Sequence, residues 1–218
     1  MNLRFIRKKK AYPEYWKQYV SHFRGTKQQT YSKTTFTVFD TETTGFDFKI
    51  DRMLSIGAVK VCDNKIKIAD VFERYIQQEH FNPDTVKIHG ILKYEDANAA
   101  EEDILKEFLA YIENSVLVAH HAYFDVTMIN EALKRQGLPK LKNKILDTGR
   151  LYAKTRINSN FINREKNYSL DELTDVLQIP KKDRHTAVGD AYITALVFLK
   201  TVSKLYKGRP FKIKYLFR

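Results

Sequence analysis

One segment constrains the fold of this chain more than any other: the stretch TFTVFDTETTGFD at positions 35–47. Its first half is apolar and β-favouring, which predicts a strand. Asp40 and Glu42 stand two residues apart at its end, so a strand projects both carboxylates from one face and Thr41 from the other. Two neighbouring acids repel each other unless a cation lies between them. Carboxylate oxygens suit Mg²⁺ or Mn²⁺, so the segment predicts a divalent-metal site at a strand end.

The residues that follow predict a binding site for a phosphate and a nucleobase. Thr43, Thr44 and Gly45 end the strand in a turn that brings backbone N–H groups beside the acids, and Phe46 follows as an apolar plug. Taken alone, a D-x-E pair at a strand end is typical of a solvated turn. The interpretation therefore depends on partner motifs further along the chain.

Composition and charge favour a nucleic acid as the partner. The chain has 218 residues, 43% of them apolar or aromatic, which suits one large α/β domain. Its 38 Lys and Arg exceed its 26 Asp and Glu and give a formal charge of +12. That excess favours a polyanion, and 13% aromatic residues favour nucleic acid. The alternative is a generally basic protein without such a partner.

The expected compartment follows from cysteine usage and the absence of long apolar runs. Cys62 is the only cysteine, so no internal disulfide can form and a reducing environment fits. The N-terminal MNLRFIRKKK has no apolar core after its charges, and no apolar run approaches the length of a membrane span. We therefore expect a cytoplasmic protein without membrane association.

The pattern of elements predicts a mixed sheet with helices. Two more strands are expected at Met53–Cys62 and Ile66–Ile76, with Asp63 and Asn64 as the hairpin turn between them. Further along the chain we expect helices at 99–114, 124–136, 169–177 and 186–204, and short strands at 115–119 and 144–147. A hairpin followed by alternating helices and strands predicts an α/β fold.

Two details of the expected helices bear on packing. Ser169, with Glu172 three residues on, predicts a capping box at the start of the helix at 169–177. In the last helix, Ala187, Ala191 and Ala195 recur every four residues and give it a smooth face. Such a face lets the helix lie close to the central strand.

Two downstream motifs supply partners for the first acids. In VAHHAYFD, Asp125 follows a buried strand at the start of a helix, where an acid alone is typical of helix capping. In HTAVGDAYITALVFL, His185 stands five residues before Asp190. Taken alone, such a histidine is typical of a surface residue or a helix end.

Together, and in this order, the three motifs resemble those of the DEDDh-type 3′–5′ exonucleases. Over roughly Thr34–Leu199 the chain is similar to the proofreading (epsilon) subunit family of bacterial DNA polymerase III. The resemblance implies a ribonuclease-H-like fold with a central five-stranded mixed β-sheet flanked by helices. One departure is His121, which stands where the family commonly has Asn. Because that residue usually supports the substrate or the loop, the change bears on substrate contacts.

The resemblance also implies the roles of the site residues. Two Mg²⁺ or Mn²⁺ ions would be held by four acids: Asp40, Glu42, Asp125 and Asp190. His185 would take a proton from the attacking water, which an imidazole can do at neutral pH. The implied contacts to the terminal nucleotide are Thr41, Thr43, Thr44, Gly45, Phe46, Asp84, His89, His121 and Phe124. The segment LDTGRLY (Leu146–Tyr152) matches a family segment whose role is mainly structural.

The chain divides into three expected parts: a basic, aromatic N-terminal extension at 1–33, an exonuclease domain at 34–204 and a basic C-terminal tail at 205–218. Aromatic residues at helical spacing in AYPEYWKQYVSHF predict an amphipathic helix packed against the main domain, with a nucleic-acid or partner-binding arm as the alternative. The basic run at 4–10 and the acid-free stretch after Lys200 are expected to draw a polyanion towards an acidic site.

The function implied is metal-dependent hydrolysis of DNA from the 3′ end, releasing nucleoside 5′-monophosphates, in proofreading or repair. Single-stranded or frayed 3′ ends would be the substrate, with a polymerase as a further expected partner. Two alternatives remain. One is an exoribonuclease that trims RNA 3′ ends, because metal chemistry at phosphate ignores the sugar. The other is a non-catalytic nucleic-acid-binding module on the same fold, which a missing carboxylate would have favoured.

Overall fold

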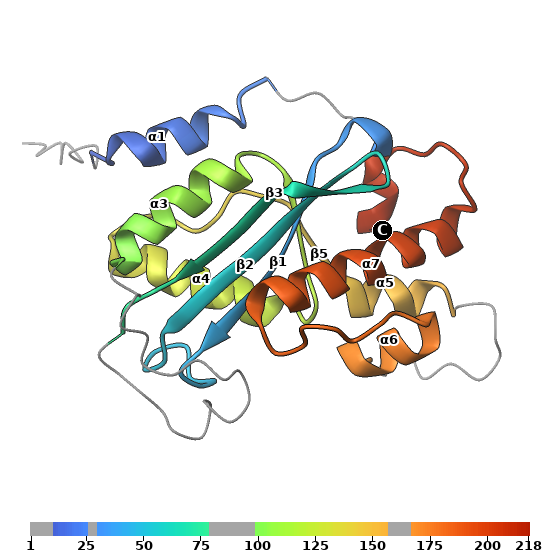
Figure 1. Cartoon of the computed structure of the whole chain (residues 1–218). Helices are drawn as coiled ribbons and strands as arrows, with labels where there is room; N and C mark the ends of the chain where they lie inside the picture. The colour runs from blue at the N-terminus through green and yellow to red at the C-terminus, as the bar shows by residue number, and fades with distance from the viewer. Residues whose placement is uncertain (1–10, 26–29, 79–98, 157–166) are drawn as a thin grey trace, which may run out of the picture.

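A five-stranded mixed sheet forms the centre of the molecule in this computed structural model, which describes residues 11–25, 30–78, 99–156 and 167–218 (Figure 1). The strand order is β3-β2-β1-β4-β5. The strands are β1 (Phe36–Thr43), β2 (Met53–Cys62), β3 (Lys65–Tyr75), β4 (Val116–Ala119) and β5 (Ile145–Asp147). β1, β2 and β3 are antiparallel neighbours, whereas β4 and β5 run parallel to β1. The predicted α/β fold and its five-stranded mixed sheet are confirmed.

β1 is the central strand and carries the first two acids past the end of its parallel pairing. It pairs with β4 only from Phe36 to Val38, whereas its antiparallel pairing with β2 continues through Asp40 and Glu42. Both acids therefore lie beside the carboxyl end of β4. Crevices at the carboxyl ends of parallel strands are the usual place for a site in α/β folds.

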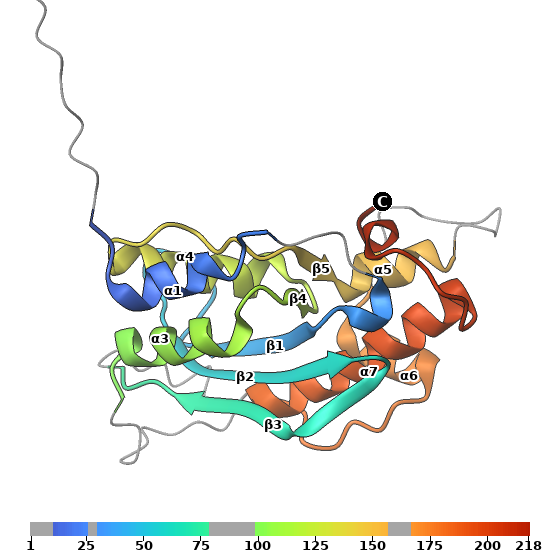
Figure 2. The same cartoon turned by 90° about the horizontal axis from the view of Figure 1, so that it is seen from above.

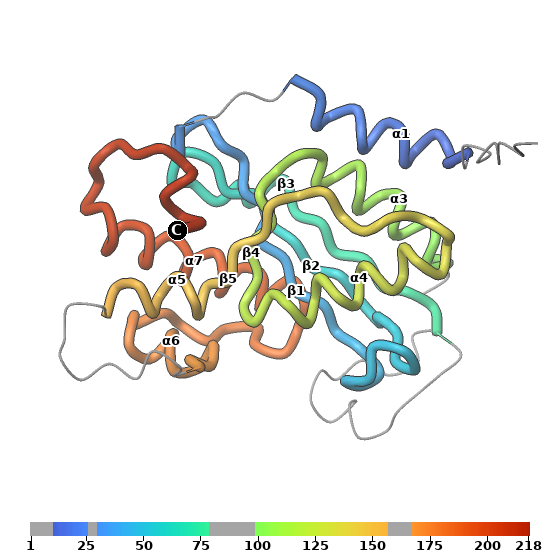
Figure 3. Tube along the Cα trace, turned by 180° about the vertical axis from the view of Figure 1, so that it is seen from behind, coloured from blue at the N-terminus to red at the C-terminus, as the bar shows by residue number. Residues whose placement is uncertain are grey.

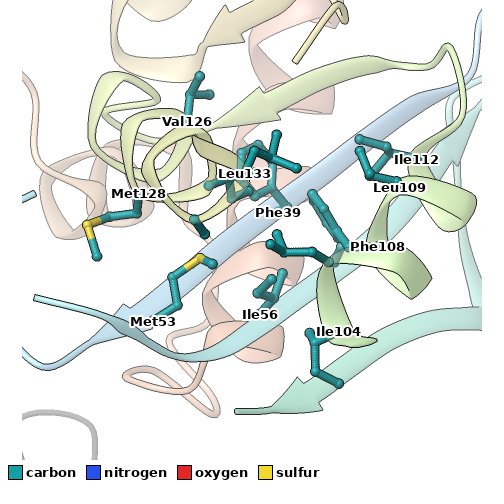
Figure 4. Close-up of a cluster of buried hydrophobic side chains, with 14 of the residues drawn as sticks. Phe39, Met53, Ile56, Ile104, Phe108, Leu109, Ile112, Val126, Met128 and Leu133 are labelled. Atoms are coloured by element: carbon teal, nitrogen blue, oxygen red, sulfur yellow. The ribbon is translucent and has the colours of Figure 1, made fainter. Parts of the chain in front are cut away.

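One face of the sheet is covered by α3 (Glu101–Ile112) and α4 (Tyr123–Arg135) (Figures 1 and 2). Figure 4 shows the core between them and the sheet, where Phe39 and Ile56 from the strands meet Phe108 and Leu109 from α3. This burial explains the apolar periodicity of α3 in the sequence.

The N-terminal helix α1 (Glu14–Ser21) packs on α3. Its Trp16 and Tyr19 are 3% and 2% exposed and belong to the same core. The Tyr19 hydroxyl donates to the Asn143 side chain at 2.6 Å, which ties α1 to the segment before β5. The predicted amphipathic helix is confirmed, and its aromatic stripe is part of the core. The basic run at 4–10 lies outside the described residues.

The opposite face of the sheet is covered by α7 (Ala187–Tyr206), with α5 (Thr148–Lys154) and α6 (Leu170–Leu177) beside it (Figure 3). The three alanines of the smooth face are buried, as the sequence predicts: Ala187, Ala191 and Ala195. Gly57 of β2 makes the approach possible, since a Cβ there would lie 2.1 Å from the Val188 backbone nitrogen. Gly57 is also the register partner of Asp40. The start of α7 therefore lies against the strand pair that carries the acids.

Two local features predicted from the sequence, a hairpin turn and a capping box, are present in the structure. Asp63 and Asn64 adopt left-handed φ values of 49° and 59°, the conformation that a two-residue hairpin requires. Ser169 and Glu172 form the predicted capping box at the start of α6. Helix α5 was not expected as a helix. Asp147 caps it by accepting a hydrogen bond from the Arg150 backbone at 2.9 Å.

The C-terminal residues, expected as a basic tail, also contribute apolar side chains to the core. Ile213 and Leu216, in a 3-10 turn at Ile213–Phe217, are buried beside the second half of α7. Tyr206 and Phe211 stack with ring centroids 3.6 Å apart. Among the described residues, no helix combines the length and apolar character needed to cross a bilayer.

Candidate active site

Three carboxylates from two distant parts of the chain meet at the end of β1. One oxygen each from Asp40, Glu42 and Asp190 lies within 4.8 Å of the others. Asp40 and Glu42 project from the face of β1 that α7 covers, as their spacing predicts. Asp190 lies in the first turn of α7, whose N-cap Thr186 accepts a hydrogen bond from the Gly189 backbone at 3.1 Å. The sequence-predicted acids of the first and third motifs are therefore together.

The fourth acid, Asp125, reaches the site from the other helical layer. It is 3% exposed in the first turn of α4. Its Oδ1 accepts hydrogen bonds from the Thr41 backbone nitrogen at 3.0 Å and from the Thr41 hydroxyl at 2.8 Å. Thr41 points away from the Asp40 face and so orients Asp125 from behind the strand. Both donors of this predicted substrate-binding residue are used within the protein.

Burial and mutual repulsion make the cluster unfavourable when fully ionised. Burial raises the pKa of Glu42 to about 7, and repulsion from Asp190 and Asp125 adds to the shift. Burial also raises the pKa of Asp40 well above its usual range, with Asp125 as the strongest repelling neighbour. The pKa of Asp125 rises to about 7 through burial, although its hydrogen bonds from Thr41 oppose the shift. A cation would reverse these shifts.

The donor set fits divalent cations. It consists of carboxylate oxygens alone, which hard cations such as Mg²⁺ and Mn²⁺ prefer. Asp190 Oδ1 is buried and has no hydrogen-bond partner in the part of the chain that the structure describes. A buried carboxylate oxygen without a donor is costly unless an ion satisfies it. Asp40, Glu42 and Asp190 would hold one such ion, and Asp125 would complete the site for a second.

Arg184 belongs to the site although the sequence analysis did not single it out. Its Nη1 donates to Asp190 Oδ2 at 2.6 Å, while Nε and Nη2 donate to the two oxygens of Asp171 on α6, each at 3.1 Å. The guanidinium thus fixes the loop before α7 to α6 and offsets part of the charge on Asp190. The sequence feature that could have pointed to Arg184 is its position directly before His185, the histidine of the H-x₄-D motif. Its pairing with Asp171 could not be read from the spacing.

His185 is placed beside the acids through its backbone. Its N–H donates to Asp190 Oδ2 at 3.4 Å, and its φ of 66° lies in the left-handed region. The side chain is exposed. The imidazole is therefore open to solvent, on a backbone that is held beside Asp190.

The loop after β1 is braced by its own side chains. The Thr43 hydroxyl donates to the Gly45 carbonyl at 2.8 Å, and the Thr44 hydroxyl donates to Asp51 at 2.7 Å. The Thr44 backbone nitrogen donates to the Arg52 carbonyl at 2.9 Å. These groups shape the loop, and their predicted contacts to a nucleotide stay predictions.

Phe46, at the tip of this loop, is 77% exposed, and its ring centroid lies 5.8 Å from that of Phe124. An exposed ring beside the acids suits stacking on a base. Asp84 and His89, also predicted to contact the terminal nucleotide, lie outside the described residues.

The backbone geometry at position 121 is compatible with the histidine found there. His121 has a φ of 55°, and Asn and His are among the residues that tolerate this region best. Its carbonyl accepts the Phe124 backbone N–H at 3.0 Å, which starts the turn that leads into α4. Asp147 braces the same turn by accepting the Ala122 N–H at 2.8 Å, consistent with a structural role for its segment.

The fold and the acidic cluster together define a hydrolase of the nuclease class. The sequence profile of the family described as Exonuclease (RNase_T) matches residues 37–198. The chain therefore belongs to this exonuclease family. The prediction of a 3′–5′ exonuclease domain similar to those of DNA polymerase III is confirmed at the level of the family.

Sequence similarity to DNA polymerase III proteins supports this family assignment. The chain is 38% identical over 173 residues to a DNA polymerase III PolC-type of Caldanaerobacter subterraneus subsp. tengcongensis, covering 78% of this chain and 12% of that protein. It is 35% identical over 181 residues to a DNA polymerase III subunit epsilon-like protein of Rhodobacter capsulatus, covering 79% of this chain and 24% of that protein. The chain thus spans about 12% of the length of the PolC-type relatives it matches.

Solved structures confirm the predicted ribonuclease-H-like exonuclease fold. The zinc-bound E. coli ExoI–ssDNA complex has a TM-score of 0.66 at 18% identity, over 81% of this chain and 42% of that one. Exonuclease X in complex with 5′-overhanging duplex DNA has a TM-score of 0.57 at 23% identity, over 77% of this chain and 91% of that one. At these identities the likeness shows the fold alone.

Proposed function

We propose that this protein is a divalent-metal-dependent 3′–5′ exonuclease that hydrolyses DNA and releases nucleoside 5′-monophosphates. The observation that carries the proposal is the convergence of Asp40, Glu42 and Asp190 within 4.8 Å, next to an Asp125 oriented by Thr41. Membership of the exonuclease family and likeness to structures solved with single-stranded DNA support it.

The acids serve as ligands in this mechanism. Asp40, Glu42 and Asp190 would hold one Mg²⁺ or Mn²⁺, and Asp125 would help to hold a second. Divalent cations bound there make water more acidic and offset the charge that develops on the phosphate. Arg184 keeps Asp190 in place through its fork to Asp171, so the ligand set is preorganised.

His185 is the general base. It takes a proton from the attacking water, whose oxygen bonds to phosphorus while the P–O bond to the 3′ oxygen of the shortened strand breaks, and solvent protonates that oxygen. Its exposed position beside Asp190 leaves its ring free to meet that water once a substrate lies over the acids. Phe46 supports the terminal base, and the loop that ends β1 fixes the position of that ring.

DNA is the proposed substrate because the relatives are named as DNA polymerase III proteins and several structural neighbours were solved with DNA. The same relatives support action beside a DNA polymerase, in proofreading or repair. A site that contacts only the phosphate would accept RNA equally well, so the assay must compare DNA with RNA.

The test is a gel assay with 5′-labelled single-stranded DNA, mismatched duplex and RNA of one sequence, each with Mg²⁺ and with Mn²⁺. The proposal predicts a ladder that shortens from the 3′ end, loss of cleavage in EDTA and faster cleavage of unpaired DNA than of RNA. Asp40→Ala should be inactive, since it removes one carboxylate of the proposed metal-binding cluster. Full activity of Asp40→Ala, or internal cuts in place of a ladder, would overturn the proposal. Faster cleavage of RNA would assign the site to RNA trimming.

A further inference from the structure

A groove of about 790 Å³ runs along α4 from the first residue of that helix. It opens between the loop after β1, which carries Phe46 and Phe48, and the face of α4 that begins at Tyr123. None of the four acids lines the groove, but the ring centroid of Phe46 at its first end lies 5.8 Å from that of Phe124, the residue before Asp125. This end of the groove is therefore the one nearer the acids. The groove continues along α4 to Lys134, eleven residues beyond Tyr123, which is about 16 Å of helix.

The end of the groove near the acids is aromatic. Phe46 and Tyr123 are 77% and 74% exposed, an unusual exposure for two large rings in one place. Phe48 lies edge-on to Tyr123 with ring centroids 5.9 Å apart and 5.6 Å from Phe124. These contacts hold the rings in one cluster, of which Phe48 and Tyr123 line the groove. Every nucleobase has a flat face that can stack on such rings, whatever the sequence.

The sides and far end of the groove are basic. Lys49, Lys134 and Lys140 line it. Among the residues that the structure describes, Lys49 and Lys140 take part in no ion pair. Lys134 pairs with Glu131 at 2.8 Å, but its side chain is 73% exposed and such a pair is weak, so a phosphate can replace the acid. The other acid of the groove, Asp47, accepts the Lys49 backbone N–H at 2.8 Å and caps its own loop.

Aromatic rings followed by ammonium groups match the chemistry of a single nucleic-acid strand. Resting on the exonuclease function proposed above, we propose that this groove binds the nucleotides on the 5′ side of the scissile end. Their bases stack on Phe48 and Tyr123, and their phosphates contact Lys49, Lys134 and Lys140. In a duplex the bases are already paired and stacked, so their faces are not available to the rings. The groove therefore selects ends with several unpaired nucleotides.

The test compares two charge-matched triple variants and one aromatic variant. K49Q/K134Q/K140Q removes the groove lysines, and K65Q/K67Q/K106Q removes three exposed lysines on β3 and α3, on elements that do not line the groove. F48A/Y123A removes the stacking rings. Fluorescence anisotropy in Ca²⁺ measures the affinity for oligodeoxynucleotides of two to eight nucleotides across a salt series. Thermal unfolding of each variant shows whether it is folded.

For the wild type, affinity should rise with length as nucleotides fill the groove. K49Q/K134Q/K140Q should flatten the slope of log K against log salt by about 2, because each phosphate contact on a single strand contributes roughly 0.7. F48A/Y123A should weaken binding of the longest oligonucleotide about tenfold or more and leave that slope nearly unchanged. In both of these variants, kcat/KM for the longest substrate divided by kcat/KM for the shortest should be lower than in the wild type. The control triple should match the wild type.

Three results would overturn the inference: the same slope in the groove triple as in the wild type, an equal loss in the control triple, or a length dependence that survives F48A/Y123A. Failure of the proposed function would look different. In that case the wild type would cleave no nucleic acid, while the binding series would still report on the groove.

Discussion

At the scale of single residues, His185 is held differently from the four acids around it. The acids are fixed by burial and by side-chain bonds, such as those from Thr41 to Asp125 and from Arg184 to Asp190. His185 is fixed by its backbone alone in the described residues, through a left-handed φ and one N–H bond to Asp190. A substitution there can therefore remove the base without disturbing the ligands.

His185→Asn should reduce kcat by on the order of 10² to 10⁴, the range for loss of a general base. Asn is chosen because it tolerates the left-handed conformation, whereas Ala would add backbone strain. Single-turnover cleavage of single-stranded DNA measures the effect, and anisotropy in Ca²⁺ shows that binding persists. His22→Asn, at the exposed end of α1, is the control and should retain wild-type kcat. Wild-type turnover in His185→Asn would remove the histidine from the mechanism.

Single residues also show where sequence reasoning works and where it stops. The acids could be predicted because strand alternation and two short motifs place them, and neither depends on distant contacts. His121 was singled out as a departure from the family pattern, but the left-handed φ of 55°, which admits either Asn or His, appears only in the folded chain. Arg184 was missed because its partner Asp171 lies in another helix, and no local rule links the two residues.

At the scale of elements, the site depends on how closely α7 approaches β2. A Cβ on Gly57 would lie 2.1 Å from the Val188 nitrogen and 2.2 Å from the Ala187 carbonyl carbon, both of them backbone atoms that cannot rotate away. Gly57 stands opposite Asp40 in the sheet, so a shift of α7 there also moves Asp190.

Gly57→Ala should therefore destabilise the protein by about 1–3 kcal/mol or more, as overpacking does. It should also weaken divalent-metal binding, because Asp190 moves away from Asp40 and Glu42. Urea unfolding measures the first effect, and the rise in Tm with added Mn²⁺ measures the second. An unchanged Tm and an unchanged response to Mn²⁺ would show that α7 can move without cost.

The elements themselves were largely predictable, because their signals are local. β2 begins and ends at the predicted residues, and the hairpin turn and the capping box at Ser169 were identified from their residue types. Helix α5 was missed because its seven residues are too few to show a periodic apolar face. Burial of Ile213 and Leu216 was also missed, since the charges around them dominate the local composition.

At the scale of the whole molecule, the acidic cluster should set the pH dependence of stability when no metal is bound. The pKa of Glu42 rises from 4.5 to about 7 on folding, and that of Asp125 rises from 3.8 to about 7. Between those values these two groups bind more protons in the folded protein than in the unfolded chain, so their contribution to stability is greatest at low pH and falls as pH rises.

In EDTA, the free energy of unfolding should therefore decrease between about pH 4.5 and 7, with Glu42 contributing at most roughly 3 kcal/mol for its shift. Glu42→Gln should flatten that decrease and be more stable than the wild type at pH 8. Saturating Mg²⁺ should restore the wild type at pH 8, since the ionised cluster is the form that binds cations. Parallel pH profiles for the wild type and Glu42→Gln would contradict the shift.

The central claim is that the four acids form one site for divalent cations. Calorimetric titration of Mn²⁺ into the protein near pH 7, in two buffers of different ionisation enthalpy, tests it most directly. We predict saturable binding with net release of protons, because Glu42 and Asp125 have pKa values of about 7 and must ionise to bind. Asp40→Ala should abolish this binding and its proton release while remaining folded. Absence of saturable binding in the wild type, or equal binding in Asp40→Ala, would contradict the claim.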